Sequence, residues 1–123
     1  MISLPLTTHK LQVVLSGAIT TNQLQASVFF HDTQKGTKAD NSEVKIFPQY
    51  STTNNTTDVD ICSAPVVDIV RQIDTIMVFN NDTVSATVTI KVDISGTDQI
   101  LKRTTLTANQ TLIYEHGTGW QVL

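Results

Sequence analysis

The stretch that decides the fold is Val84-Ser-Ala-Thr-Val-Thr-Ile-Lys-Val-Asp-Ile94. Apolar side chains alternate with polar ones along all eleven of its residues. Because successive side chains of a β-strand point to opposite faces, this period of two predicts a strand with one buried face and one solvent-facing face. A surface helix would instead repeat its apolar residues three and four positions apart, which this stretch does not do.

The segments that precede this stretch also have the pattern of strands. Ile73 to Phe79 is apolar on both of its alternating faces, as in a strand covered on both sides. The residues between the two strands, Asn80-Asn81-Asp82-Thr83, favour turns, so we expect a hairpin here. Leu11 to Leu15 and Leu24 to Phe30 each place apolar side chains on one face. We expect these two segments to form a second antiparallel pair.

The rest of the chain alternates between polar stretches and further short strands. We expect exposed loops at 32–42 and 51–57, short strands at 43–47, 58–62, 99–106, 112–114 and 120–123, and one turn of helix within 66–71. Eight or nine short strands without a long helix are typical of an all-β fold. We therefore predict an antiparallel β-sandwich of jelly-roll type, with a partly open barrel as the alternative.

Length and composition set limits on the class of protein. The chain has 123 residues, enough for one domain over 1–123, and only 15% of them are charged. The net charge of −3 disfavours nucleic acid as a partner, since phosphate binding depends on clustered Lys and Arg. We also expect no membrane span and no signal peptide, and hence a soluble protein made in the cytoplasm. The single cysteine, Cys62, is predicted to be a small buried hydrophobic residue.

A search for chemistry yields no catalytic motif. His9, His31 and His116 stand apart in sequence, without the spacing of a metal site. Asp58 and Asp60 share one face of a strand and could form half of a calcium or glycosidase site, but their alternation with apolar neighbours favours a solvent-facing strand surface. We therefore predict no catalytic residue, no metal and no cofactor, and a protein that is not an enzyme.

Six residues are candidates for an interface with another chain. Phe29 lies opposite the predicted core face that holds Phe30, and an exposed Phe on a sheet usually marks contact with another layer. Trp120 either caps the protein's own core or sits in an oligomer interface. Residues 1–8 could form an N-terminal arm, which either folds back as a first strand or reaches a neighbouring subunit. The six candidates are Ile2, Leu4, Pro5, Leu6, Phe29 and Trp120.

Several segments together resemble small virion proteins of tailed phages. They are Ile73-Asp-Thr-Ile-Met-Val-Phe-Asn80, the alternating strand that follows it, Leu106-Thr-Ala-Asn-Gln-Thr-Leu-Ile-Tyr114, Gly119-Trp-Gln-Val122 and the opening Lys10-Leu-Gln-Val-Val-Leu-Ser-Gly-Ala18. The resemblance covers most of the chain, with Asn109 standing where Gly is common. It implies a β-sandwich that decorates or cements the capsid surface, with the major capsid protein and further copies of itself, as a dimer or trimer, as partners.

Two alternatives belong to other functional classes. One is a tail or baseplate module that binds host glycan, or another tail protein, through aromatic side chains and Asn/Asp loops. The other is a small hydrolase, which would need converging carboxylates or a histidine dyad that the spacing of these residues does not supply. The number of copies per particle separates decoration from a tail part, because a capsid carries hundreds of decoration proteins and a tail only a handful of any module.

Overall fold

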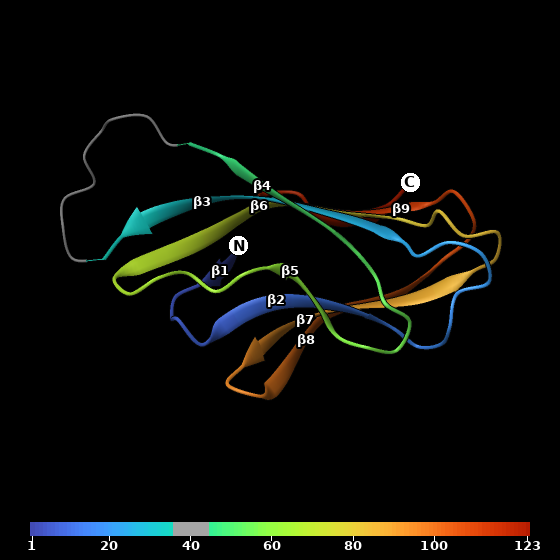
Figure 1. The fold of residues 1–123 in the computed structure, drawn as a ribbon. Helices are drawn as coiled ribbons and strands as arrows, with labels where there is room; N and C mark the ends of the chain where they lie inside the picture. Colours follow the sequence, from blue (N-terminus) through green and yellow to red (C-terminus); the bar gives the residue numbers. More distant parts are fainter. Residues whose placement is uncertain (36–44) are drawn as a thin grey trace.

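The computed structural model describes residues 1–35 and 45–123, and the described residues form ten β-strands and no helix. The strands are arranged in two antiparallel sheets that stack face to face (Figure 1). The strands are β1 (Ile2–Leu4), β2 (His9–Leu15), β3 (Gln25–Gln34), β4 (Phe47–Thr52), β5 (Val59–Cys62), β6 (Ile69–Phe79), β7 (Ala86–Ile94), β8 (Thr97–Leu106), β9 (Thr111–Glu115) and β10 (Gly119–Val122). The all-β, antiparallel prediction is confirmed.

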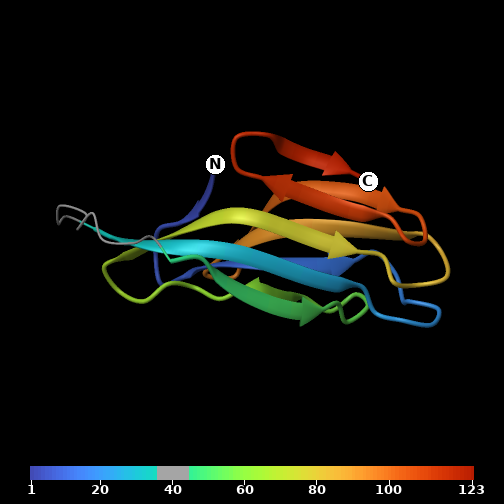
Figure 2. The same ribbon diagram turned by 90° about the horizontal axis from the view of Figure 1, so that it is seen from above.

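The larger sheet, sheet A, has the order β10-β9-β6-β3-β4, and sheet B has the order β5-β2-β7-β8. Strand β1 is also part of sheet A, where it pairs with residues 71–73 of β6, and β9 pairs with residues 75–79 of the same strand. Figure 2 shows β1 and β9 following one another along one edge of β6. Residues 2–4 of the predicted N-terminal arm therefore fold back as a first strand.

The predicted hairpin and the second predicted antiparallel pair are both wrong, and for the same reason. Strand β2 pairs with β7 and β5, whereas β3 pairs with β6 and β4, so β2 and β3 lie in different sheets. The same holds for β6 and β7. The chain passes from one sheet to the other between β2 and β3, and again between β6 and β7. The alternation of side chains reveals which face of a strand is buried but not which strand lies beside it.

Several predicted boundaries also shift. Strand β3 extends through Gln34 and β4 through Thr52, into segments expected to be loops, and the helical turn expected at 66–71 is absent because β6 already begins at Ile69. The strand expected at 43–47 and the loop at 32–42 fall partly on residues 36–44, which lie outside the described residues. Lys45 and Ile46 precede β4, which begins at Phe47.

The core lies between the two sheets and draws on both. Val88, Ile90 and Val92 of β7 are buried as the alternation predicts, whereas Val84 and Ile94 at the ends of that stretch are 45% and 39% exposed. Their partners from the two sheets form one cluster: Leu4, Leu11, Val13, Leu15, Leu24, Ala26, Val28, Phe30, Ile61, Cys62, Ile73, Ile76, Val78, Leu106, Leu112 and Tyr114. The two inner faces therefore bury each other, and what remains for function is the outer faces, the edges and the ends.

Turns close the strand pairs that remain adjacent. Ser95 and Gly96 join β7 to β8 with φ values of 52° and 91°, the pair of left-handed residues that a two-residue type I′ turn requires. Asn109 lies in the turn by which the chain passes from β8 in sheet B to β9 in sheet A, and its φ of 67° is the left-handed conformation expected of it.

Candidate interaction surfaces

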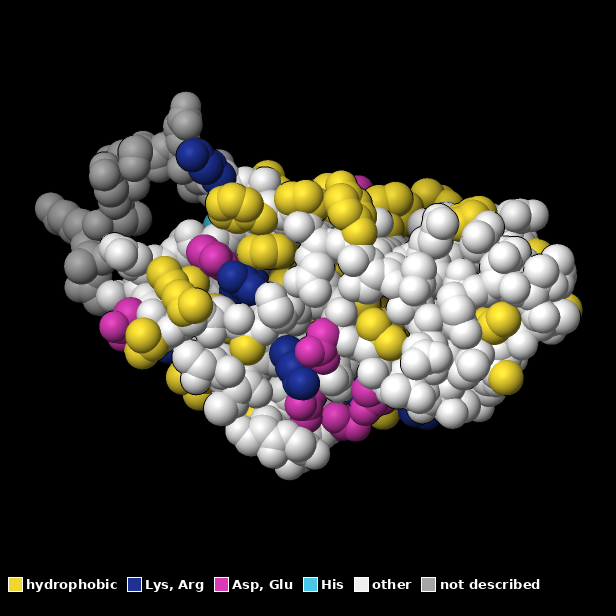
Figure 3. Space-filling view, viewed as in Figure 1, with side chains coloured by type: hydrophobic (Ala, Val, Ile, Leu, Met, Phe, Trp, Pro, Cys, Tyr) yellow, Lys and Arg dark blue, Asp and Glu magenta, His cyan; other side chains and the backbone are white. Residues whose placement is uncertain are grey.

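The outer face of sheet A is apolar at its centre. On β3 the core takes Ala26 and Val28, which turns Ser27 and Phe29 outward, and the same alternation turns Met77 of β6 outward. Four side chains form this surface, which we call the apolar face: Phe29, Tyr50, Met77 and Ile113. In Figure 3, hydrophobic atoms follow the upper margin of the molecule, where sheet A lies. The sheet thus has apolar side chains on both sides, although only one side is covered by sheet B.

The side chains of the apolar face come from four neighbouring strands in one register. Tyr50 is opposite Ser27, Ser27 is opposite Met77, and Met77 is opposite Ile113. The rings of Phe29 and Tyr50 meet edge to face with centroids 6.3 Å apart. Tyr50 is 69% exposed and Met77 is 38% exposed, while Phe29 is partly buried. Phe29 therefore does face outward as predicted, but it is half covered by its neighbours.

A hollow lies at one side of the apolar face, between β3 and β4. Its volume is about 510 Å³, and it is lined by Gln25, Ala26, Ser27, Tyr50, Ser51 and Thr52. Its lining contains hydroxyl and amide groups beside one exposed aromatic ring. It contains no carboxylate and no histidine, so it offers contact surface but no acid or base.

The outer face of sheet B has the opposite character, with charges joined across strands. Lys91, on the central strand β7, lies 2.6 Å from Asp98 and 2.9 Å from Asp58, and it is only 6% exposed. Burial alone would lower the pKa of Lys91, but its hydrogen bonds to Asp98 and Asp58 and their negative charges raise the pKa above 10.5. Lys91 thus connects the edge strand β8 with the residue that precedes the other edge strand, β5, across the centre of sheet B.

A second cation connects another part of the same face. Lys10 lies 3.4 Å from Asp60 and 3.9 Å from Asp93, and the amide of Gln12 donates a 2.7 Å hydrogen bond to Asp60. Asp58 and Asp60 are both exposed and both paired with lysine, as expected of a solvent-facing strand surface. In Figure 3, acidic and basic atoms gather low in the view, on the side of sheet B.

The loops at one end of the sandwich are held by buried Asn and Asp side chains. The carboxylate of Asp82 accepts hydrogen bonds from the backbone N–H groups of Thr20, Thr21 and Asn22, at 2.7, 2.7 and 3.1 Å. These bonds, with that from Thr20 contributing most, lower the pKa of Asp82 from 3.8 to about 2. The buried Asp82 therefore holds the β2–β3 loop against the β6–β7 loop.

Asn80 links the same region to the end of β8. Its side-chain amide donates 2.9 Å hydrogen bonds to the carbonyls of Val84 and Leu106, and its side-chain oxygen accepts a 2.9 Å bond from the N–H of Asp82. Asn80 is completely buried. Asn55 has a similar role, because its side-chain oxygen accepts bonds from Ile19 and Gln23. These Asn and Asp side chains are engaged within the protein rather than free to bind a ligand.

The opposite end of the sandwich carries a small apolar surface, which we call the end cluster. It consists of Pro5, Leu6, Val66 and Val67, which line a hollow of about 270 Å³ together with Thr7, Lys35 and Asp68. Leu6, Val66 and Val67 are 51%, 67% and 73% exposed. Two of the predicted interface residues, Pro5 and Leu6, therefore meet two valines from a loop distant in sequence.

The other predicted interface residues lie mostly against the protein's own core. Leu4 is completely buried in it, and Ile2 packs against it, with the backbone N–H of Ile2 3.2 Å from the hydroxyl of Tyr114. Trp120 also packs against the core, with its ring centroid 5.0 Å from that of Tyr114. In this conformation Leu4 is inaccessible to a partner, while Ile2 and Trp120 are partly accessible.

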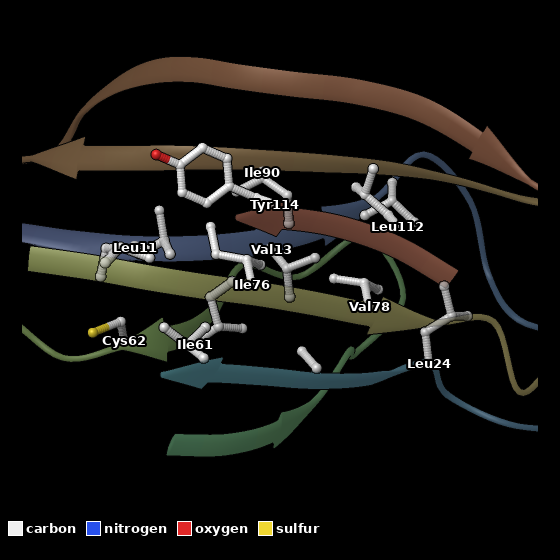
Figure 4. Close-up of a cluster of buried hydrophobic side chains, with 14 of the residues drawn as sticks. Leu11, Val13, Leu24, Ile61, Cys62, Ile76, Val78, Ile90, Leu112 and Tyr114 are labelled. Atoms are coloured by element: carbon white, nitrogen blue, oxygen red, sulfur yellow. The ribbon is translucent and has the colours of Figure 1, made fainter. Parts of the chain in front are cut away.

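Of the groups that could carry chemistry, His31, Asp74 and His116 come together at one hollow, while Cys62 is buried. The described residues contain no group of three His, Cys, Asp or Glu side chains placed to hold a metal ion. Nδ1 of His31 lies 2.8 Å from Asp74, and both line a hollow of about 240 Å³ with His116. Cys62 lies in the core beside Ile61 (Figure 4), and burial raises the pKa of its thiol to about 11, so the reactive thiolate is disfavoured at neutral pH.

One well-connected residue was missed by sequence reasoning. Arg71, at the start of β6, donates two hydrogen bonds to the carboxylate of Asp32, at 2.9 and 3.0 Å, and one of 2.8 Å to the carbonyl of Ser63. Its guanidinium also lies 4.2 Å from the centre of the Phe30 ring. The hydrogen bond to Asp32, against the opposing effect of burial, raises the pKa of Arg71 further. No local pattern marks it, because its partners come from distant segments.

Comparisons with protein-family models, with curated proteins and with solved structures found no match. In the part of the chain that the structure describes, no helix is long and apolar enough to cross a membrane.

Proposed function

We propose that the protein is a non-enzymatic structural protein that acts by binding other proteins. The observation that carries this proposal is the presence of two separate apolar surfaces, the apolar face on sheet A and the end cluster at one end of the sandwich. Exposed apolar groups of this kind typically mark contacts with other macromolecules. The hollow beside the apolar face has no charged side chain in its lining, and that of the end cluster has one lysine and one aspartate, Lys35 and Asp68.

Within that class, we propose a capsid decoration or cement protein of a tailed phage, located on the capsid surface and bound to the major capsid protein as a homo-oligomer. The support is the resemblance of its strand and turn segments to small phage virion proteins. Such a protein needs one surface for its own copies and a second for the shell, and this chain has two candidates. The jelly-roll assignment belongs to this proposal, supported by two antiparallel sheets and connections that pass between them.

In this proposal the end cluster contacts the major capsid protein. Pro5 and Leu6 are held next to β1, which is hydrogen-bonded into sheet A, so the cluster is fixed to the body of the sandwich. Its hollow of about 270 Å³ can accept an apolar side chain from the shell. One such contact is weak, but an oligomer that engages several subunits at once gains strongly in affinity.

A second candidate is a tail or baseplate module that binds glycan, and one observation favours it. Tyr50 is 69% exposed and lines the hollow of about 510 Å³ with Gln25, Ser27 and Thr52, which combines an aromatic ring with hydrogen-bonding groups. The Asn/Asp part of the predicted glycan surface has less support, because Asn80 and Asp82 are engaged inside the protein.

Electron microscopy of the particle that carries the protein, with its copy number from mass spectrometry, tests the two candidates. Hundreds of copies on the shell support decoration, whereas a handful of copies in the tail support the second candidate. Particles from the source organism that never carry the protein would refute both.

A binding assay then tests the surface. Stripped capsids are incubated with the protein, with Leu6→Asp and with a control, Val84→Asp. Leu6 and Val84 are 51% and 45% exposed at different sites. Leu6→Asp should abolish binding and the gain in heat resistance, and Val84→Asp should preserve both. Equal binding by both variants would exclude the end cluster.

A further inference from the structure

The apolar face lacks a covering layer from the described part of the chain, and we propose that it binds the same face of a second copy of this protein. Strand β6 has apolar side chains on both faces, the pattern of a strand buried on both sides. Sheet B covers the face of β6 that carries Ile76 and Val78, and both side chains are completely buried. Met77, between them in sequence, points to the other face and remains 38% exposed. A second sheet packed on the outer side would complete the burial that this pattern predicts.

The dimensions of sheet A suit such a contact. Five strands lie side by side in it, and the two longest, β3 and β6, have 10 and 11 residues. With strands ~4.8 Å apart and ~3.3 Å per residue, the outer face covers roughly 600 Å² in each copy. Two copies would bury roughly 1,200 Å² in total, the lower end of the range for specific interfaces. We therefore expect a weak, reversible dimer rather than a permanent one.

The distribution of charge favours a copy of this chain over a charged partner. The chain carries a net charge of −3, so two copies repel unless they meet through a neutral surface. The charged side chains of the described outer face of sheet A lie at the margin of the apolar face: Glu115 at the end of β9, two residues beyond Ile113, and His31 with Asp74, which pair with each other. The outer face of sheet B, by contrast, carries Lys10, Lys91, Asp58, Asp60, Asp93 and Asp98.

The surroundings of the apolar face are also suited to a two-fold contact. Ser27, Gln25 and Thr75 lie beside it on β3 and β6. Hydroxyl and amide groups both donate and accept hydrogen bonds, so the same group from two copies can pair across a symmetry axis. An axis through the middle of the sheet passes near Met77, because β6 is the central strand of the five. The two sheets would stack ~10 Å apart with strands within ~30° of each other.

This inference rests on the proposed function in one respect: it names the surface through which the proposed homo-oligomer forms. It assigns the apolar face to self-association and leaves the end cluster free for the shell. The dimer is therefore predicted for the isolated protein, whatever its partner.

Sedimentation equilibrium of the purified protein from about 1 µM to 1 mM tests the inference. We expect a monomer–dimer equilibrium in which Met77→Lys raises the dissociation constant at least tenfold, because two ammonium groups would meet near the axis. The control is Ile94→Lys, which makes the same change at a strand residue of matched exposure, 39%, on sheet B. It should change the dissociation constant by less than about threefold.

Circular dichroism establishes that each variant is folded. If Met77→Lys does not fold, Tyr50→Ser on the edge strand β4 replaces it. Tyr50 is 69% exposed, so its replacement should disturb the folded monomer little. A protein that stays monomeric at 1 mM overturns the inference. A dimer whose dissociation constant is unchanged by the variant of the apolar face also overturns it. So does a dimer that Ile94→Lys weakens as much as that variant does.

Failure of the inference and failure of the proposed function give different results. A dimer that depends on Met77, together with no binding to capsids, supports the inference and rejects the decoration function. Capsid binding by a monomer that never dimerises does the reverse.

Discussion

Replacing Asn80 by Ala should lower the free energy of unfolding by about 2–6 kcal/mol. The side chain of Asn80 is completely buried and makes three hydrogen bonds, to the carbonyls of Val84 and Leu106 and from the N–H of Asp82. The carbonyl of Leu106 and the N–H of Asp82 would lose these partners inside the protein. Each unsatisfied buried group costs about 1–3 kcal/mol, while Val84 lies nearer the surface and can bond to water instead.

Urea unfolding measures this cost, with Trp120 fluorescence and circular dichroism as separate probes. The protein is kept well below 1 µM or compared at one fixed concentration, so that self-association does not add to its stability. The neighbouring Asn81 is exposed, and Asn81→Ala should change the free energy of unfolding by no more than about 0.5 kcal/mol. A cost below about 1 kcal/mol for Asn80→Ala, or equal costs at both positions, would refute the role given to this side chain.

Three further predictions concern the charges and one turn. Lys91→Met should lower the free energy of unfolding by about 1–2 kcal/mol in urea at pH 7. Because the folded protein raises the pKa of Lys91 above 10.5, the difference in unfolding free energy between wild type and variant should shrink as the pH rises past that value. A difference that stays constant with pH would contradict this. Asp82 has a lowered pKa of about 2, so its contribution to stability is present above pH 3.8 and is lost as the pH falls towards 2. The melting temperatures of wild type and Asp82→Asn should therefore converge over that range. Melting temperatures that differ by the same amount at every pH would refute this. Ser95→Asn should raise the melting temperature by about 2 °C, since Asn tolerates the left-handed conformation of this turn position better than Ser, and a lower melting temperature would count against the turn.

The fold class could be predicted from the sequence, but the strand pairing could not. Alternation identified Val88, Ile90 and Val92 as core residues because a strand exposes its faces in a fixed period. Strands β6 and β7 were assigned to one hairpin because closeness in sequence was the only available guide to which strands are neighbours. The loop between them instead crosses the sandwich, held by hydrogen bonds that the backbone N–H groups of Thr20 and Thr21 donate to the Asp82 carboxylate, which no local pattern reveals.

The candidate surfaces were predicted only in part. Phe29 was identified because its neighbour Phe30 belongs to the core, and the apolar outer side of Met77 and Phe79 was visible in the sequence. That side was expected to be covered, whereas the structure leaves Met77 38% exposed. The end cluster could not be found from the sequence, because Leu6 meets Val66 and Val67 only through the path of the folded chain.

The passage of the chain between the sheets at β2–β3 and again at β6–β7 has a consequence for the order of folding. Lys10 of β2 pairs with Asp93 of β7, and Ile2 of β1 pairs with Ile73 of β6, so each of the first two strands has a partner in the second half of the chain. Closing such long loops is entropically costly before any contact repays it, which slows folding to milliseconds or longer. During synthesis on the ribosome, β1 must therefore wait, unpaired and open to aggregation, until β6 has emerged.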